Sequence, residues 1–460
     1  MRRFFRRLIP LFVVALVVVP ILAACASATP TPAPAPPKAT AAPKPPPEAT
    51  KPAAEAPKPA AEAPKPAAEA AKPAEAKPVA AAPKPASGKP IRVGNMEPMT
   101  GPMAMFGAET LIAQNLAIED VNKAGGINGS PLELVNCDDS YDPKQTVTCM
   151  RKLIDQEKVP AIFGPFTGSL AEVAFPLANE AKVPVFSHII VPGMAAQYRP
   201  WTFQINLQAD EYWPAGVKAF KAKYPDAKNA VIAVDIKERS PQYTGKELLP
   251  KLFKDAGINL LGSVDFEGGT TDWASYATKI KSMKPDVLTV VANPPEGFGL
   301  HMELEKQGFK SKLLLDPMHV YSFLFWQQSP EYMEGTIFPE WNSWLRSDPK
   351  TKDFVERWQA KVKADPSQPP APPGSKIYHF PSYDISNYDA IMAVAQVMRD
   401  AKITPETPLA EARQKIRDGY QNLKNFPGAS GSITVKPTGD VSWTAPVMIF
   451  EKGEIKQIVP

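Results

Sequence analysis

The sequence has little histidine and little cysteine, the residues that most often carry metal and nucleophilic chemistry. Its 460 residues include four histidines and three cysteines. The histidines are scattered, and no G-x-S-x-G elbow, P-loop lysine motif, H-E-x-x-H or paired Cys/His metal spacing occurs. No G-x-G-x-x-G motif follows a strand, which argues against a dinucleotide. We therefore predict a protein that is not an enzyme and that needs no metal and no cofactor.

Long apolar runs are also scarce, and after Leu8–Ala24 no second candidate for a membrane span follows. This run comes after four arginines, a pattern typical of an export signal. An uncleaved signal anchor is the alternative. The run ends in "LAAC" (22–25), which resembles the bacterial lipobox, whose cysteine is acylated and becomes the first mature residue. We predict a signal peptide over 1–24, and a lipid on Cys25 that anchors an extracytoplasmic protein to the lipid bilayer of the cell membrane.

The segment 25–89 contains almost nothing that a folded core could bury. It is rich in proline, alanine and lysine, and "KPAAEAP" occurs twice in succession, over 51–57 and 58–64. Proline blocks helix and sheet, so we predict a disordered, partly polyproline II tether. At roughly 3.1 Å per residue it would span on the order of 200 Å when stretched. A spacer is the expected role, and a partner-binding role is the alternative.

The basic balance of the whole chain comes from these N-terminal segments. The signal carries four arginines, and the tether carries nine lysines and five glutamates, which is a net of +4. Subtracting both from the formal net charge of +4 leaves −4 for residues 90–460. The folded part is mildly acidic, so we expect no nucleic acid partner.

Residues 90–460 alternate between segments typical of buried strands and segments typical of amphipathic helices. The expected strands are 91–96, 132–137, 159–164, 183–187, 229–236, 258–266, 285–293 and 312–316. The expected helices are 108–126, 142–158, 168–182, 243–257, 272–284 and 295–308. Strands joined by helical crossovers form parallel sheets covered on both faces. The pattern restarts after residue 206, so we predict an α/β fold with two doubly wound parallel-sheet lobes around a cleft.

Several segments, in order along this region, resemble one protein family. They are "MTGPMAMFGAE" (99–109), "AIEDVNKAGGINGSPLELV" (117–135), "DDSYDPKQTVTCMRKLI" (138–154), "AIFGPFTGSLAEVA" (161–174) and "GDVSW" (439–443). They are similar to the extracytoplasmic substrate-binding proteins of ABC importers, of the leucine/isoleucine/valine type with the type I periplasmic-binding fold. The resemblance implies a monomeric clamp that closes on a small-molecule ligand and docks on the permease subunits in the membrane.

The resemblance also implies how the chain is divided. Lobe 1 would contain 90–207 and 341–432, and lobe 2 would contain 208–340 and 433–460. Three crossovers between the lobes would lie near 206–209, 338–342 and 430–434. A sensory lipoprotein that presents its ligand to a membrane receptor would have the same fold, and it is the alternative function.

In the first lobe the resemblance places ligand contacts after two strands. Phe106 matches a bulky family residue that lies over the ligand. The family serine that holds a ligand carboxylate corresponds to Gly168, which is flanked by Thr167 and Ser169 at the start of a helix. Helix N-termini favour anions, so the backbone amides remain available there although the hydroxyl has moved.

The third loop of this lobe departs furthest from the family pattern. Amino acid binders have a threonine-containing loop here, whereas this chain has "HIIVPG" (188–193), with His188, Ile190 and Val191 as candidate contacts. Val191 stands at the threonine position and cannot hydrogen-bond through its side chain. Missing donors cost roughly 1–3 kcal/mol each for a buried zwitterion. We infer a more apolar ligand, such as an aromatic or aliphatic acid or an amide.

In the second lobe the resemblance points to Tyr243, Asn293, Asp316 and His319, each after a strand. Asp316 lies near the acid with which amino acid binders hold the ammonium group. Simpler roles exist for several candidates. Phe106 and Tyr243 could be core residues, Thr167 and Ser169 helix caps, His188 and His319 solvated loop residues, and Trp341 and Trp344 packing residues near a crossover.

The two cysteines beyond Cys25 bracket an aspartate-rich stretch, "NCDDSYDPKQTVTC" (136–149). Cys137 ends a strand, and Cys149 lies in the helix expected to pack back on it. Because exported proteins retain disulfides, we predict a Cys137–Cys149 bridge. A calcium loop needs more ligands and a glycine turn, and a redox pair usually has C-x-x-C spacing. Asp142 is expected to cap the following helix.

Overall fold

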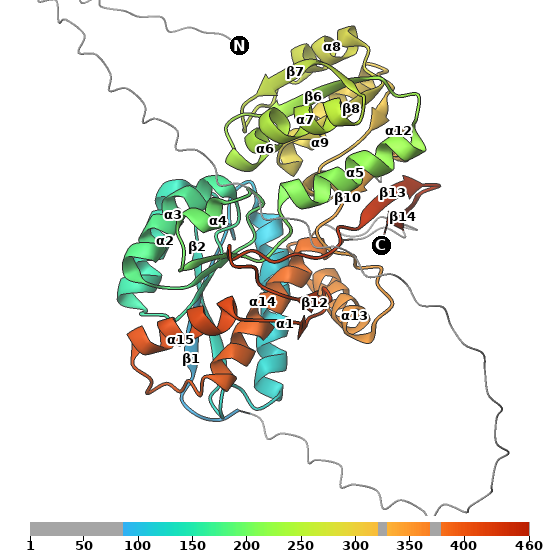
Figure 1. The fold of residues 1–460 in the computed structure, drawn as a ribbon. Helices are drawn as coiled ribbons and strands as arrows, with labels where there is room; N and C mark the ends of the chain where they lie inside the picture. The colour runs from blue at the N-terminus through green and yellow to red at the C-terminus, as the bar shows by residue number, and fades with distance from the viewer. Residues whose placement is uncertain (1–85, 321–328, 369–378, 460) are drawn as a thin grey trace, which may run out of the picture. The chain divides into compact units, whose positions relative to one another are not determined.

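The computed structural model describes residues 86–320, 329–368 and 379–459, and two parallel sheets with flanking helices dominate this part of the chain (Figure 1). The predicted signal peptide, Cys25 and nearly all of the predicted tether lie outside the described residues. Within the described residues, no helix combines the length and the apolar character that crossing a membrane requires.

The first sheet has five parallel strands in the order β2-β1-β3-β4-β5. Its strands are β1 (Ile91–Glu97), β2 (Leu132–Asp138), β3 (Ile162–Phe163), β4 (Val185–Ser187) and β5 (Thr202–Gln204). The intervening helices are α1 (Ala104–Lys123), α2 (Pro143–Arg151) with a π-helical turn η1 (Lys152–Gln156), α3 (Gly168–Ala181) and α4 (Met194–Gln197).

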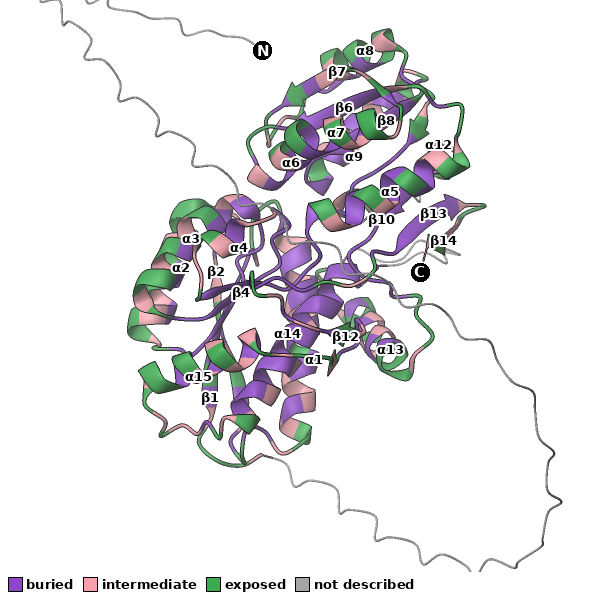
Figure 2. Ribbon diagram, in the orientation of Figure 1, coloured by how far each residue is buried: buried purple, intermediate pink, exposed green. Residues whose placement is uncertain are grey.

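Helices cover both faces of this sheet, as the buried strands require (Figure 2). Ile91 and Val93 of β1 belong to the same buried cluster as residues of α1 and α14. Met96, further along the same strand, belongs to a second cluster that includes Phe175 of α3. Burial of each such side chain contributes roughly 1.5–3 kcal/mol, so the two clusters clamp the sheet between helical layers.

The second sheet has four parallel strands in the order β7-β6-β8-β9. They are β6 (Asn229–Asp235), β7 (Asn259–Phe266), β8 (Val287–Val291) and β9 (Lys312–Leu313). The helices of this region are α5 (Ala209–Lys223), α6 (Arg239–Tyr243), α7 (Leu249–Asp255), α8 (Ala274–Met283), α9 (Pro294–Lys306), α10 (Pro317–Val320) and α12 (Pro330–Met333), with a π-helical turn η2 (Thr244–Leu248).

The remaining elements complete both regions. An antiparallel sheet has the order β10-β13-β14, and β11 pairs with β12. Their bounds are β10 (Ile337–Pro339), β11 (Phe426–Pro427), β12 (Ser432–Ile433), β13 (Val447–Glu451) and β14 (Glu454–Val459). The helices between them are α13 (Pro349–Ala364), α14 (Ser382–Asp400) and α15 (Leu409–Gln421). Helix α14 packs along α1, although more than 250 residues separate them in the sequence (Figure 1).

The chain passes three times between these regions. It leaves the first sheet after β5, returns after β10 to the helices that pack with α1, and leaves again after β12 to form β13 and β14. The predicted α/β fold with two parallel sheets and three crossovers is therefore confirmed.

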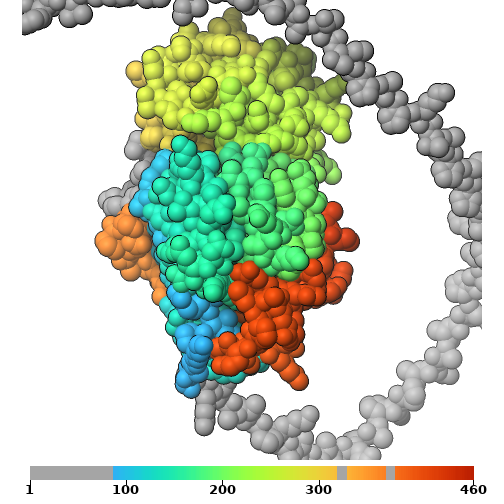
Figure 3. All heavy atoms as spheres, turned by 90° about the vertical axis from the view of Figure 1, so that its left-hand side faces the viewer, coloured from blue at the N-terminus to red at the C-terminus, as the bar shows by residue number. Residues whose placement is uncertain are grey.

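Buried Arg413 ties α15 to the first sheet. Its guanidinium donates to the carbonyl oxygens of Val159 (3.0 and 3.1 Å), Ala181 (3.1 Å) and Ile154 (3.4 Å). Figure 3 shows orange-red atoms, the colour of the region that contains α15, lying beside the teal atoms of the region that contains α2 and α3. A planar guanidinium offers five donors, so one side chain satisfies carbonyls at the ends of two segments.

Two local predictions need correction. Helix α1 begins at Ala104 rather than near residue 108. At Gly107 the helix approaches the preceding chain so closely that a Cβ would lie 2.3 Å from the Pro98 carbonyl oxygen. The helix expected over 243–257 is divided into α6, η2 and α7. Pro250 has no N–H to donate to the preceding turn, which accounts for the widened π-helical turn before it.

The aspartate-rich stretch is structural, and its predicted disulfide is confirmed. Cys137 and Cys149 are bonded, with their Cα atoms 5.6 Å apart. Asp142 caps α2 by accepting from the backbone amides of Lys144 (2.8 Å) and Gln145 (3.0 Å), as predicted. Within the described residues, no group of three or more His, Cys, Asp or Glu side chains is arranged to hold a metal ion.

We predict that removing this disulfide destabilises the folded chain. The C137S/C149S double variant should lose about 3 kcal/mol in the free energy of unfolding, because the bridge closes a short loop and restricts the unfolded chain. Urea unfolding of the two proteins measures this difference. In reductant the wild type should fall to the stability of the variant. A difference that persists unchanged in reductant would mean that packing of the serines, and not the disulfide, is responsible.

Candidate functional site

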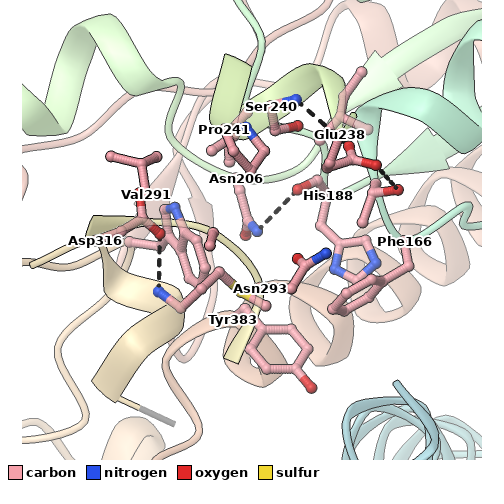
Figure 4. Close-up of a pocket in the computed structure, with 16 residues that line it drawn as sticks. Phe166, His188, Asn206, Glu238, Ser240, Pro241, Val291, Asn293, Asp316 and Tyr383 are labelled. Carbon is pink, nitrogen blue, oxygen red and sulfur yellow. Dashed lines mark hydrogen bonds between the residues drawn. The ribbon is translucent and has the colours of Figure 1, made fainter. Parts of the chain in front are cut away.

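A cavity opens where loops from both parallel sheets meet (Figure 4). Its lining residues are Phe166, Thr167, His188, Ile189, Ile190, Asn206, Glu238, Ser240, Pro241, Val291, Ala292, Asn293, Asp316, Met318, Trp341 and Tyr383.

Most of these residues follow the carboxyl end of a parallel strand. Phe166 and Thr167 follow β3, His188 follows β4, and Asn206 follows β5. In the second sheet, the lining residues lie at the end of β8 and in the loops after β6, β8 and β9. Parallel strands bring these loops to one edge of each sheet, which is where ligands bind in open α/β folds.

Aromatic rings form one wall of the cavity (Figure 4). The ring of Phe166 lies edge-on to His188, with centroids 5.0 Å apart, and to Tyr383, at 6.0 Å. Tyr383 in turn lies edge-on to Trp341 at 6.2 Å. Together with the isoleucines of the loop after β4, these rings make a surface suited to an apolar ligand body.

Glu238 connects the two sets of loops. Its buried carboxylate accepts from the Ser169 backbone amide (3.2 Å) at the start of α3, from the Tyr141 hydroxyl (3.2 Å) and from the Thr167 hydroxyl (3.5 Å). The Tyr141 hydroxyl accepts from the Asn293 side-chain amide (2.8 Å). Burial raises the pKa of Glu238, while the hydrogen bonds from Ser169, Ser240 and Tyr141 oppose that shift.

Asp316 lies away from Glu238 across the cavity (Figure 4). Its side chain is 3% exposed, and one carboxyl oxygen accepts from the Met318 amide (3.0 Å). The other oxygen, Oδ2, has no hydrogen-bond partner among the described residues. Burial raises the pKa of Asp316 to about 7. This carboxyl group therefore changes charge near neutral pH.

Behind the cavity, His188 belongs to a buried polar cluster. Its Nε2 lies 3.7 Å from Glu97 Oε2, and its Nδ1 lies 3.4 Å from the Asn387 side-chain amide nitrogen. Asp384 in α14 is also buried, and burial followed by the charges of Glu109 and Glu97 raises its pKa well above the ordinary value. His188 is thus a buried residue and not a solvated loop residue.

The structure brings five of the predicted contacts to the cavity, namely Thr167, His188, Ile190, Asn293 and Asp316. Their role as ligand contacts stays a prediction. The side chain of His319 and the whole of Cys25 lie outside the described residues.

Five other candidates are placed beside the described cavity rather than in its lining. Phe106 packs against Phe166, with ring centroids 6.0 Å apart, and is 2% exposed. Ser169 accepts from the Arg239 amide (3.0 Å) through its hydroxyl, and Tyr243 lies under the Arg239 guanidinium at 5.8 Å. Gly168 and Val191 are buried next to each other. These positions favour packing roles for Phe106 and Tyr243.

Sequence reasoning missed several lining residues. Trp341 was expected only to pack near a crossover, but it lines the cavity, whereas Trp344 packs against Phe380 with centroids 4.8 Å apart. Tyr383 comes from α14, where no motif singles it out. Glu238 follows strand β6, a position where ligand contacts occur in open α/β folds, but the charged stretch around it resembles a solvated loop.

Comparisons with known proteins agree with this architecture. The family model described as "Periplasmic binding protein" matches residues 90–451. The Leu/Ile/Val-binding protein homolog 7 of Brucella abortus is 27% identical over 243 residues, which are 50% of this chain and 59% of that protein. The leucine-, isoleucine-, valine-, threonine- and alanine-binding protein of Pseudomonas aeruginosa is 25% identical over 70% of this chain and 81% of its own length. This chain thus spans less than two thirds of the Brucella relative.

Solved structures show the same fold. A leucine-binding protein from Thermotoga maritima superposes with a TM-score of 0.67 at 22% identity, covering 80% of this chain and 97% of that one. A solute-binding protein of an ABC transporter from R. palustris, in complex with 4-hydroxybenzoate, gives 0.68 at 19% identity, covering 81% and 96%. The relatives named here are binding proteins and not enzymes. The family match spans more than half of the chain, and the chain therefore belongs to the periplasmic binding protein family.

Proposed function

We propose that this chain is an extracytoplasmic solute-binding lipoprotein that captures a small organic ligand in the cavity and delivers it to an ABC importer. The observation that carries the proposal is a buried, largely apolar cavity at the strand ends of both sheets, with a few polar groups on its wall. The ligand is amino acid-like, an apolar or aromatic acid, or an amide. Relatives named for binding leucine and other amino acids, and a structural neighbour in complex with 4-hydroxybenzoate, support this range.

In this proposal the two sets of loops close on the ligand as parts of two lobes, 90–207 with 341–432 and 208–340 with 433–460. Lipid on Cys25 holds the protein at the membrane, and the tether lets the clamp reach the permease. The protein acts as a monomer.

A ligand screen tests the binding role. Thermal unfolding of the exported chain with leucine, benzoate-type acids, amides and amines should reveal a stabilising compound. A ligand at a hundredfold excess over its Kd stabilises by about 2.7 kcal/mol. The I190W variant should lose the shift because the larger ring fills the cavity, whereas L261W, at a residue 39% exposed near the amino end of β7 and not among the cavity-lining residues, should keep it. An unaltered shift in I190W would place binding elsewhere, and micromolar leucine binding would contradict the preference for a more apolar ligand.

The lipid anchor is tested separately. Cells grown with a clickable palmitate analogue should label the wild-type chain and leave the C25S variant unlabelled, because acylation needs the lipobox thiol. The C137S/C149S variant retains Cys25 and should label like the wild type. Label on C25S would overturn the assignment of the anchor to this cysteine.

The raised pKa of Asp316 predicts a pH dependence of stability. Between about pH 4 and pH 7 the folded protein holds a proton that the unfolded chain releases, so this residue makes stability fall as the pH rises through that range. The D316N variant has no titrating carboxyl group at this position, so it lacks this pH-dependent contribution to the free energy of unfolding. The difference in the free energy of unfolding, D316N minus wild type, should therefore rise by a few kcal/mol between pH 4 and pH 7, since a pKa shift of one unit corresponds to about 1.4 kcal/mol.

Asp286 provides the control for this measurement. Backbone amides of Lys228 and Asn229 donate to its carboxylate and hold its pKa below the usual value. Its contribution is lost only as the pH falls below about 4, so the difference between D286N and wild type should be flat from pH 4 to pH 7. A flat difference for D316N as well would contradict the predicted titration.

A further inference from the structure

The start of helix α3 is already occupied by a carboxylate from the protein itself. Glu238 Oε1 accepts from the Ser169 amide at 3.2 Å, and Oε2 lies 3.5 Å from the Thr167 hydroxyl. In return, Ser169 Oγ accepts from the Arg239 amide at 3.0 Å. Free amides and the helix dipole make the N-terminus of a helix a preferred position for a negative charge. Glu238 fills that position from the loop after β6.

The burial of Glu238 depends on these contacts. The residue is 6% exposed, and the Tyr141 hydroxyl (3.2 Å) and the Ser240 amide (3.4 Å) supply further donors to its carboxylate. A buried carboxylate without such donors is strongly unfavourable. An incoming carboxylate at the start of α3 would therefore have to displace a group that is already fully paired.

Gly168 lies beside this arrangement, at the first residue of α3. A Cβ at position 168 would lie 2.8 Å from Ser240 Oγ and 3.4 Å from Arg239 Cβ. A side chain there would require the Ser240 hydroxyl to move. Position 168 thus has no side chain that could bind a ligand. The carboxylate of Glu238 lies at the start of α3, where a ligand carboxylate would otherwise bind.

Two buried polar atoms of the cavity wall point to a different chemistry, while a third, His188 Nε2, faces Glu97 Oε2 at 3.7 Å. Asp316 Oδ2 and Asn206 Oδ1 are buried, belong to lining residues and have no hydrogen-bond partner among the described residues. Asn206 Oδ1 accepts hydrogen bonds, and Asp316 Oδ2 does so when the carboxyl group is ionised. No lysine or arginine is among the described residues that line the cavity. A ligand that offers N–H donors satisfies these atoms, whereas a carboxylate would meet further acceptors.

We propose that Glu238 determines the ligand class of this site, because its carboxylate occupies the anion position at the start of α3. The cavity therefore does not bind a ligand carboxylate at that position. It binds a small apolar molecule that ends in an amine or amide nitrogen. The inference rests on the proposed binding function and narrows it. Asp316 and Asn206 receive the nitrogen, and the rings of Phe166 and Tyr383 contact the apolar body.

Three probes that share one apolar body test this proposal. Calorimetric titration of the full exported chain with 2-phenylethylamine, phenylacetamide and phenylacetate compares a cation, a neutral amide and a carboxylate. The wild type should bind at least one nitrogen probe at least tenfold more tightly than phenylacetate. E238A exposes the amide of Ser169 and the start of α3, so its affinity for phenylacetate should increase at least tenfold.

Two further variants make the result specific. E172A removes an exposed carboxylate of α3 that lies 3.9 Å from the Arg239 guanidinium, and it should leave all three affinities unchanged. E238Q keeps the size of the side chain and removes its charge, so it should give a smaller gain for phenylacetate, and it replaces E238A if that variant does not fold.

Equal wild-type affinity for phenylacetate and the nitrogen probes would overturn the inference. The absence of a phenylacetate gain in both Glu238 variants would overturn it as well, even when no probe binds the wild type. The proposed binding function is judged by the wider ligand screen, so the two can fail separately.

Discussion

Parallel pairing of the strands is the constraint on which the rest of the structure depends. Parallel neighbours cannot be joined by a tight turn, so each strand requires a crossover, and each crossover returns the chain to the same edge of the sheet. The loops after β3, β4 and β5, and those after β6, β8 and β9, are consequently gathered at the carboxyl edges, where the cavity lies. Helices must then cover both faces, which explains why α14 returns late in the chain to pack along α1.

The cavity wall shows two solutions to the problem of burying a carboxyl group without a cation. Glu238 keeps a set of backbone and hydroxyl donors around its oxygens. Asp316 has one backbone donor, and its pKa of about 7 means that much of the desolvation cost is avoided by holding a proton. The two groups therefore differ in kind. Glu238 is matched to partners within the protein, whereas Asp316 still has an oxygen whose hydrogen bonding is open to a ligand.

The parts of this structure that could be predicted from the sequence are those with a local cause. The alternating apolar segments predicted the parallel sheets, and Asp142 followed by proline predicted the start of α2. The family resemblance, applied to residues that follow strands, predicted Asn293 and Asp316 as ligand contacts, and both line the cavity. Glu238 stands in a charged stretch, "KERS", that resembles a solvated loop, and its burial depends on Ser169, 69 positions away. Tyr383 belongs to a helix whose approach to the cavity is decided by packing alone.

The placement of a protein carboxylate at α3 changes how discrimination between ligands arises. A free carboxylate loses translational and rotational freedom on binding, whereas Glu238 is tethered and loses very little. The tethered group behaves as a competitor at a high effective concentration, which no change in ligand concentration removes. Selectivity against acids then needs no repulsive contact with the ligand body. It follows because Glu238 occupies the position at which the N-terminus of α3 favours a negative charge.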